Sequence, residues 1–590
     1  MDDGTGPPVS RSDRRRADTA VSRRFFLRRA AVAAGSLVVV GGAALGLDEA
    51  LAGGGSRPRV ARSTTTTTRP VTATTTTTEP ATVMAESADG VMLPTSPAVM
   101  AENARPGTPW WIPTAQTPRS IEGFAGQVSA VAGDEVTLYV NTGAASFHVE
   151  AYRMGYYQGI GGRLIWTSPE VVGTVQPPPV LDPGLHTVEC HWTPSTTLPV
   201  TADWVPGSYL LKLVGVGGEE QYVPLCVRDD ASTAALVVQH SVTTWQAYNL
   251  WGGYSLYYGR ADGGLSYDQS PGGGSFEHRA RVVSFDRPYS WAWASGAADY
   301  IGNELPVVYD VERLGLDVTY WTDVDLHARP DLLLRHRGLL SLGHDEYWSA
   351  PMRQGAAAAV TAGVNLGFLG ANACYRQIRF EDSPVGPNRH QVCYKSAAED
   401  PLAASQPALT TVNWPDPPVD QPECTLIGAT YQDIGAEADL VVTDPGHWVL
   451  AGVGLTAGQR LPKVVQGEFD RYVPGQAGSD TVDVVAHSPV ANRGGNSSDM
   501  TWWTQPGGGG VFATGNATWI GGMVNTTGFP TDIVPAAVPG VTAHLLRIME
   551  NVYSVLGGGP GSASHPSQGT WRAAYGGKPL PAAPNPAGTT

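Results

Sequence analysis

Three polar side chains follow an apolar run in the middle of the chain, within residues 339–349. The run Leu-Leu-Ser-Leu is typical of a buried strand, and the turn after it carries His344, Asp345 and Glu346. This turn contains no thiol, and its only aliphatic hydroxyl belongs to Ser349, which stands where a helix cap is expected. Chemistry at this turn therefore requires a bound metal or an activated water to supply the nucleophile.

The segment 235–372 has to position this turn, and its pattern alternates between strands and helices. A helix is predicted directly after the turn, with Pro in its first turn and Gly at its end. Strands are predicted at residues 235–240, 281–285, 318–321, 339–342 and 364–369, and a further helix at 306–314. This succession predicts a parallel sheet with helices on both faces. The loops with Tyr248, Glu346 and Asn372 follow strands, so we expect them at the ligand-binding edge of that sheet.

An all-β pattern precedes this segment. Alternating strands are predicted at residues 135–140, 147–152, 207–214 and 221–226, and the last two flank a Gly-Gly turn typical of a hairpin. We therefore predict an immunoglobulin-like β-sandwich at residues 110–230. The α/β domain is predicted at residues 231–557, with a class I amidotransferase-like (flavodoxin-like) sheet. Its β-rich part after Arg376 is expected to extend or cover the sheet, and an amphipathic helix is predicted around residues 545–555.

Three segments are predicted to lie outside these domains. Residues 1–52 contain Arg23 and Arg24 before Phe-Phe-Leu and an uncharged stretch, which is typical of a twin-arginine signal peptide cleaved before Gly53. A membrane anchor is the alternative, but Gly and Ala make this stretch only mildly apolar. Residues 53–109, rich in Thr and Pro, are predicted to be a disordered linker, and residues 558–590 a disordered tail. We therefore expect export by the twin-arginine pathway, to the cell envelope or the extracellular space.

The composition argues against several classes of protein. The net charge of −16 at pH 7 argues against nucleic acid and anionic membranes as partners. The five cysteines form no CxxC pair, so a structural zinc site is not expected. Export permits disulfides, and Cys190 with Cys226 is one candidate bridge within a single predicted domain. The sequence alone does not decide the pairing.

Five short motifs resemble the family of the large subunit of N,N-dimethylformamidase and its C-terminal-domain relatives. The matching segments are Thr-Trp-Gln-Ala-Tyr-Asn at 244–249, Phe-Asp-Arg-Pro-Tyr at 285–289, Gly-His-Asp-Glu-Tyr-Trp at 343–348, Gly-Ala-Asn at 370–372 and Gly-Glu at 467–468. The Gly- and Tyr-rich loop 153–162 and the hairpin after Gly207 are similar to the β domain of that family. The resemblance covers residues 121–556 and is strongest between residues 236 and 372.

This resemblance implies a mononuclear ferric iron and hydrolysis of a C–N amide bond in a small molecule. The residues that match the iron ligands of the family are Tyr248, Tyr289 and Glu346. Those that match its catalytic polar shell are His344, Asn372 and Glu468, the last as general base. Phenolate and carboxylate oxygens are hard anionic donors that suit ferric iron. The enzyme of that family works with a separate small subunit, and nothing in this sequence resembles one.

Each of these residues also has a structural explanation. A tyrosine in a loop after a strand is usually a half-buried phenol, Glu346 could cap the next helix, and Asn372 could shape a turn. The rival function is that of an exported protein that binds cell-envelope glycan through its β-sandwich and aromatic loops, with a catalytically silent α/β domain. Stoichiometric iron in the purified protein would distinguish the two, and the gathering of these motifs at strand ends favours the amidase.

Overall fold

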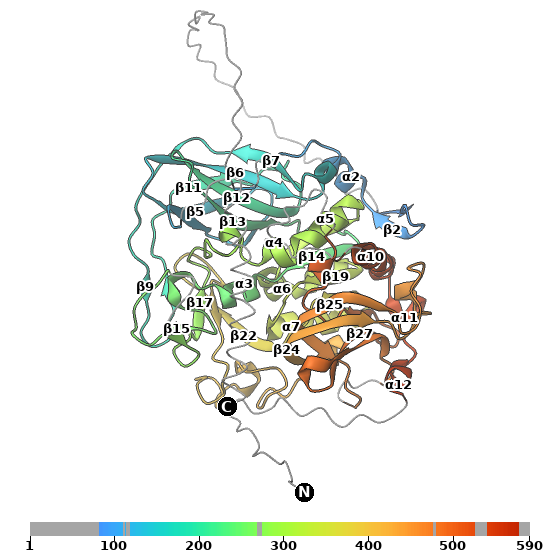
Figure 1. The fold of residues 1–590 in the computed structure, drawn as a ribbon. Helices are drawn as coiled ribbons and strands as arrows, with labels where there is room; N and C mark the ends of the chain where they lie inside the picture. The colour runs from blue at the N-terminus through green and yellow to red at the C-terminus, as the bar shows by residue number, and fades with distance from the viewer. Residues whose placement is uncertain are drawn as a thin grey trace, which may run out of the picture.

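The computed structural model describes residues 82–109, 112–113, 118–267, 274–475, 480–524, 538 and 540–576. The predicted signal peptide at residues 1–52 lies outside them, as does the first part of the predicted linker. Among the described residues, no helix is long and apolar enough to span a bilayer. Figure 1 shows a unit made of β-sheets packed on a larger unit of mixed α/β structure.

A seven-stranded sheet forms the centre of the α/β unit (Figure 1). Its strands, in spatial order, are β18 (Val318–Thr322), β14 (Leu236–His240), β19 (Gly338–Leu342), β21 (Asn365–Leu369), β28 (Gly510–Ala513), β27 (Asn496–Thr504) and β26 (Asp483–Val490). The first five are parallel, as predicted for this sheet, and the last two run antiparallel to their neighbours. The β-rich part of the chain therefore extends the sheet, and the sequence pattern did not indicate β27.

Alternate side chains of the central strands enter two different cores, which explains their unbroken apolar sequence. Along β14, Leu236 and Val238 face one core, whereas Val237 faces the other. The first core is covered by α5 (Leu305–Arg313) and α10 (Val541–Gly558), and the second by α6 (Asp323–Ala328) and α7 (Ala350–Thr361). The Ser349 hydroxyl caps α7 by accepting a hydrogen bond from the Met352 amide at 3.4 Å. The predicted helices on both faces are confirmed.

The β unit consists of two sheets that enclose one core. One sheet contains β11 (Thr196–Pro199), β5 (Glu135–Thr142) and β3 (Ile121–Ala125). The other contains β4 (Ser129–Ala130), β13 (Glu220–Val227), β12 (Gly207–Gly215), β6 (Ser146–Met154) and β7 (Gly162–Thr167), with β8 (Val171–Val172) beside β6. Val136 from the first sheet and Val149 and Leu211 from the second lie in the shared core. The predicted all-β region and its hairpin β12–β13 are confirmed.

The predicted linker and tail contain more structure than their composition indicated. Described residues of the predicted linker form β1 (Val83–Glu86), β2 (Met92–Thr95) and α2 (Pro97–Asn103). Described residues of the predicted tail form α11 (Gly561–Ser564) and α12 (Trp571–Ala574). Leu93 and Val99 join the main core, and the Trp571 ring packs on Tyr472. A few apolar side chains within polar sequence are enough to hold these stretches in place.

Two further expectations differ from the structure. The strand predicted at residues 281–285 forms as β17 (Val282–Ser284), but it pairs outside the main sheet. Its partners belong to a four-stranded sheet with β23 (His390–Val392), β22 (Arg376–Glu381) and β20 (Tyr347–Ser349). The candidate bridge between Cys190 and Cys226 is not formed, because these residues lie in different cores. All five cysteines are buried, and none of them forms a disulfide.

A buried ion pair joins the β unit to the α/β unit. Arg153 of β6 donates to both carboxylate oxygens of Glu312 in α5, at 3.0 and 2.7 Å. Glu312 also accepts hydrogen bonds from the Tyr320 hydroxyl, at 2.6 Å, and from Asn103 of α2. Neither side chain of the ion pair is more than 1% exposed. Loss of either partner would leave a buried charge without compensation, so this pair fixes how the two units dock.

Replacing Glu312 by Gln keeps the volume of the side chain but leaves Arg153 buried without a counter-ion. We expect the free energy of unfolding to fall by about 3–5 kcal/mol, measured by chemical denaturation. The control is Glu277→Gln at an exposed position, which should stay within about 0.5 kcal/mol of the wild type. Equal stability of the two variants would show that the ion pair does not hold the units together.

Candidate active site

The carboxyl ends of β19 and β21 carry two turns that touch each other. Gly343, directly after β19, has a φ of 61°, a value that favours glycine. At Gly370, after β21, an added Cβ atom would lie 1.9 Å from the Gly343 carbonyl oxygen. The two glycines therefore let the turn with His344 and Glu346 pack against the turn with Asn372.

Glu346 is a buried carboxylate with three close donors. It is 1% exposed. Its Oε2 accepts from the Tyr248 hydroxyl at 2.8 Å, and its Oε1 accepts from the Tyr257 hydroxyl at 2.5 Å and from Arg376 Nε at 3.1 Å. Tyr248 ends α3 (Val242–Tyr248), the helix after β14, and its ring stacks on Tyr257 with centroids 4.5 Å apart. Two phenols and a guanidinium thus replace the water that a free carboxylate would bind.

Neighbouring charges keep this carboxylate ionised. Burial raises the pKa of Glu346, but the cationic side chains around it, His344 first among them, lower that pKa to below its usual value. Burial raises the pKa of Tyr248 and of Tyr257 well above the usual value, and the charge of Glu346 raises it further. Both phenols are therefore protonated donors to an ionised Glu346.

His344 and Glu468 form a second buried pair beside Glu346. Glu468 lies in β25 (Arg460–Arg471), which forms a long hairpin with β24 (Thr430–Val441). His344 Nε2 lies 2.7 Å from Glu468 Oε2 and 3.5 Å from Glu346 Oε2. Burial lowers the pKa of His344, but the two carboxylates raise it more strongly, to about 9. The imidazole is therefore cationic at neutral pH and lies between two acids.

Asn372 completes this polar group. Its Nδ2 lies 3.4 Å from Glu468 Oε2 and 3.3 Å from His344 Nε2. Its Oδ1 is buried and has no hydrogen-bond partner among the described residues. The backbone amide of Asn372 donates to Asp470 Oδ1 at 2.9 Å, and burial raises the pKa of Asp470 to about 8. Asn372 therefore offers a free acceptor next to the His344–Glu468 pair, above an acid that is largely neutral at pH 7.

Tyr289 stands apart from the other five predicted site residues. Its ring packs edge-on against Trp245, with centroids 6.3 Å apart, and Glu346 takes its hydrogen bonds from other side chains. Its main chain, however, lies close to Tyr248: Asn249 donates to the Pro288 carbonyl at 2.9 Å and accepts from the Ser290 amide at 3.2 Å. Tyr289 as a metal ligand stays a prediction.

The structure adds three residues that the sequence reasoning missed: Tyr257, Arg376 and Lys395. Lys395 Nζ donates to the Tyr347 hydroxyl at 2.6 Å and lies 3.1 Å from the centroid of the Tyr257 ring. Burial lowers the pKa of Lys395 well below its usual value, and the nearby Arg376 lowers it further. The aromatic run around Tyr257 was a signal that could have pointed to it. Arg376 and Lys395 belong to no motif, so the local sequence gives no sign that they join the site.

The arrangement has the elements that acid–base chemistry on a polar substrate requires. Oxygen donors from Tyr248, Tyr257 and Glu346 converge within hydrogen-bond distance, with no thiol among them. Such a hard oxygen set suits a small, highly charged cation better than a soft one. Beside it, the His344–Glu468 pair can exchange a proton with a bound molecule.

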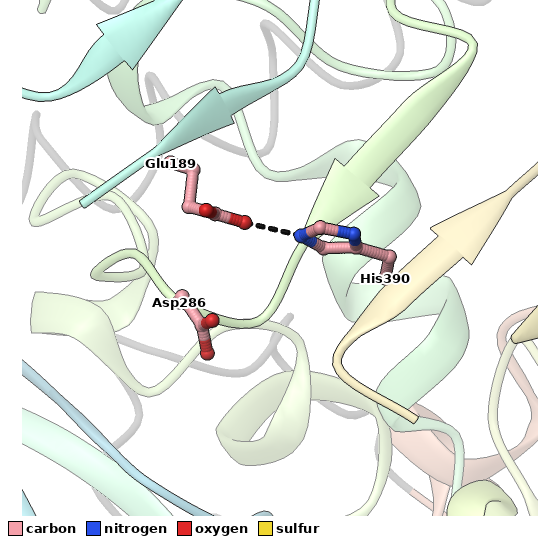
Figure 2. A group of neighbouring side chains, drawn as sticks. All are labelled: Glu189, Asp286 and His390. Atoms are coloured by element: carbon pink, nitrogen blue, oxygen red, sulfur yellow. Dashed lines mark hydrogen bonds and ion pairs between the residues drawn. The ribbon is translucent and has the colours of Figure 1, made fainter. Parts of the chain in front are cut away.

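A second group of metal-binding side chains, Glu189, Asp286 and His390, lies elsewhere (Figure 2). Its ligand atoms lie within 4.8 Å of one another. Figure 2 shows Glu189 joined to His390, whereas Asp286 is joined to neither. Asp286 instead forms an ion pair with Arg389 at 2.7 Å. Because this guanidinium already neutralises Asp286, we read the group as an ion-paired network and assign it no metal.

Comparison with known proteins places the chain in a family. Residues 148–529 match the family described as N,N-dimethylformamidase beta subunit-like, C-terminal. The match includes every residue of the cluster around Glu346 and most of the β unit. No curated protein matches the chain. Since the match spans more than half of the 590 residues, the chain belongs to the N,N-dimethylformamidase beta subunit-like C-terminal family.

Proposed function

We propose that this protein is a hydrolase that cleaves a C–N amide bond of a small molecule, with iron as its cofactor. The observation that carries the proposal is the convergence of Tyr248, Glu346, His344 and Glu468 at one buried point. Membership of a dimethylformamidase-like family supports an amidase in general terms. A glycan-binding surface would not require two buried acids on either side of a buried cationic imidazole.

The donors at this point fit a ferric ion. Tyr248 and Glu346 present phenol and carboxylate oxygens 2.8 Å apart, and hard cations prefer such ligands. We assign Tyr248, Tyr289 and Glu346 as ligands, with Tyr257 and Arg376 orienting Glu346. The side chain of Asn249, the residue after Tyr248, binds the main chain on both sides of Tyr289, so the two segments lie side by side. A ferric ion held there would supply Lewis-acid polarisation of an amide carbonyl.

The remaining polar residues handle protons. Glu468, 2.7 Å from His344 Nε2, is assigned as the general base that takes a proton from the attacking water. The same proton then passes to the amine nitrogen as the C–N bond breaks. His344, whose pKa is raised to about 9, stays beside Glu468 as a cationic hydrogen-bond donor. The free Oδ1 of Asn372 is placed to accept a hydrogen bond from the water or the substrate.

We also propose finer fold assignments. When the five parallel strands are numbered in chain order, their spatial order in the sheet is 2-1-3-4-5, which is the order of flavodoxin-like sheets. This order supports a class I amidotransferase-like α/β unit. Two mostly antiparallel sheets around one core support an immunoglobulin-like sandwich for the β unit.

Replacing a tyrosine ligand by Phe removes one oxygen but keeps the ring and its packing. We expect Tyr248→Phe and Tyr289→Phe to lose most of their iron and the charge-transfer colour of a ferric phenolate, measured by metal analysis and visible absorption. Tyr257→Phe removes only a donor to Glu346, so its iron affinity should fall by about 10- to 100-fold.

The matched control is Tyr156→Phe, a half-buried tyrosine in the β unit, which should bind iron like the wild type. A folded wild-type protein that stays colourless and takes up no iron would contradict the cofactor assignment. Full iron in Tyr289→Phe with loss in Tyr257→Phe would move the second phenolate to Tyr257.

Glu468→Gln tests the proton-transfer role separately from metal binding. The change keeps the shape of the side chain but removes its basicity, so we expect iron content to be retained and turnover to fall by about 10²- to 10⁴-fold. N,N-dimethylformamide is the probe substrate, and released dimethylamine is the readout. Glu437→Gln, at an exposed position of the paired strand β24, is the control. Unchanged turnover in Glu468→Gln would remove Glu468 from the mechanism.

We further propose that the protein is exported by the twin-arginine pathway, because Arg23 and Arg24 precede Phe-Phe-Leu and a mildly apolar stretch. That pathway carries folded proteins, which suits a chain that binds its cofactor before export.

Changing Arg23 and Arg24 to Lys should keep the protein in the cytoplasm, because the pathway reads the arginine pair rather than its charge. Cell fractionation with immunoblotting measures the location, and N-terminal sequencing of the exported wild type should give a start near Gly53. Changing Arg28 and Arg29 to Lys is the control and should leave export intact. An exported chain that still carries residues 1–52 would contradict the signal-peptide assignment.

A further inference from the structure

A chain of three buried side chains crosses the interface between the two units, away from the Glu346 carboxylate. Ser208 lies in β12, His240 ends β14, and Glu304 directly precedes α5. Ser208 Oγ lies 2.6 Å from His240 Nε2, and His240 Nδ1 lies 2.6 Å from Glu304 Oε2. The three residues are 3%, 2% and 0% exposed, respectively. This is the geometry of a nucleophile, its general base and the carboxylate that orients the base.

Glu304 is held so that it can only accept hydrogen bonds. Its Oε1 accepts from the Ser241 amide at 3.1 Å, the Ser241 hydroxyl at 2.5 Å and Trp245 Nε1 at 2.8 Å. Its Oε2 lies 2.6 Å from His240 Nδ1, and an imidazole that donates to Glu304 carries its proton on Nδ1. That tautomer leaves His240 Nε2 as the acceptor for the Ser208 hydroxyl.

Ser208 and His240 line a cavity between the β unit and the α/β unit. Its volume is about 40 Å³, which is room for roughly two or three water-sized groups. Phe124, Val128 and Phe285 make much of its wall apolar. If Ser208 served only to join β12 to β14, it would not need a cavity beside it. Arg287 and Arg389 also line it. The cavity has room for a small acyl group.

Tyr300 provides a second, independent sign of a ligand. It lines the same cavity and is 2% exposed. Apart from an approach to Ser208, its hydroxyl has no hydrogen-bond partner among the described residues. Burial raises the pKa of Tyr300 well above its usual value, so the hydroxyl stays a donor. A buried hydroxyl whose one near neighbour is the serine oxygen could also donate to an oxyanion formed on that serine.

We propose that Ser208, His240 and Glu304 form a second catalytic site that hydrolyses esters of small acyl groups. Ser208 Oγ attacks the ester carbonyl carbon, its proton moves to His240 Nε2, and the Tyr300 hydroxyl donates to the oxyanion. When the bond between the carbonyl carbon and the alcohol oxygen breaks, the leaving oxygen takes the proton from Nε2. Glu304 acts only through His240, as a positioning residue.

Water completes the reaction by the reverse path. It attacks the acyl carbon on Ser208 and gives one proton to His240 Nε2. As the bond between the acyl carbon and Ser208 Oγ breaks, that proton returns to Oγ and a carboxylic acid is released. No metal or external oxidant takes part in these steps. Tyr289, proposed above as an iron ligand, lines the same cavity, so the activity is tested in iron-depleted protein.

Methanesulfonyl fluoride, a small reagent that fits the cavity, tests the nucleophile directly. Ser208 Oγ should form a bond to sulfur while fluoride leaves and His240 takes the proton. Mass spectrometry of the iron-depleted full chain should locate one methylsulfonyl group on Ser208. Ser208→Ala should lose this label, whereas Ser168→Ala, a buried serine elsewhere in the β unit, should keep it.

His240→Gln should label more slowly by about 10²- to 10⁴-fold. Glu304→Gln should also slow labelling, by at least about tenfold, while near-ultraviolet circular dichroism confirms an intact fold. A merely structural Glu304 would leave the labelling rate of the folded variant unchanged. Wild-type protein in which Ser208 stays unlabelled at saturating reagent would overturn the proposal.

Discussion

The negative charge of Glu346, held away from water, is the constraint on which the candidate site depends. A buried carboxylate is stable only when hydrogen bonds and opposite charges replace its hydration. Tyr248, Tyr257 and Arg376 supply the hydrogen bonds, and His344 supplies a further positive charge. The cationic His344 also pairs with a second carboxylate, that of Glu468. The other members of the polar cluster thus stabilise, directly or through His344, the one buried charge of Glu346.

Both units contribute to the surroundings of the site. Parallel strands bring the turns after β19 and β21 together at one edge, and the hairpin β24–β25 adds Glu468 from a distant part of the sequence. The hydrogen bonds to Glu346 among the described residues come from the α/β unit, and the docking of the β unit is fixed by the Arg153–Glu312 pair. The contact between Ser208 and His240 crosses the same interface. Burying polar groups at this boundary costs free energy unless the groups are paired. We therefore expect the paired groups found there to have a functional role.

Local sequence patterns were sufficient for much of the fold, because apolar runs and alternation report burial directly. The strands of the parallel sheet, the cap at Ser349 and the β12–β13 hairpin follow from neighbouring residues alone. Non-local pairing was not predictable: β17 has the pattern of a sheet strand, yet its partner β23 lies far along the chain. Motifs indicated Glu346, His344 and Asn372, but Arg376 and Lys395 join the site only through the folding of separate segments. The composition of residues 82–109 and 558–576 likewise concealed the few apolar side chains that hold them.

Anomalous X-ray diffraction at the iron absorption edge shows whether the cluster around Glu346 binds iron. Crystals of the full chain supplied with ferric iron should show one anomalous peak, at about 2 Å from oxygens of Tyr248 and Glu346. The position of that peak would also show which second tyrosine supplies an oxygen. A peak at Glu189 and His390 instead, or no peak near Glu346 in a crystal of folded protein, would show that this cluster does not bind iron.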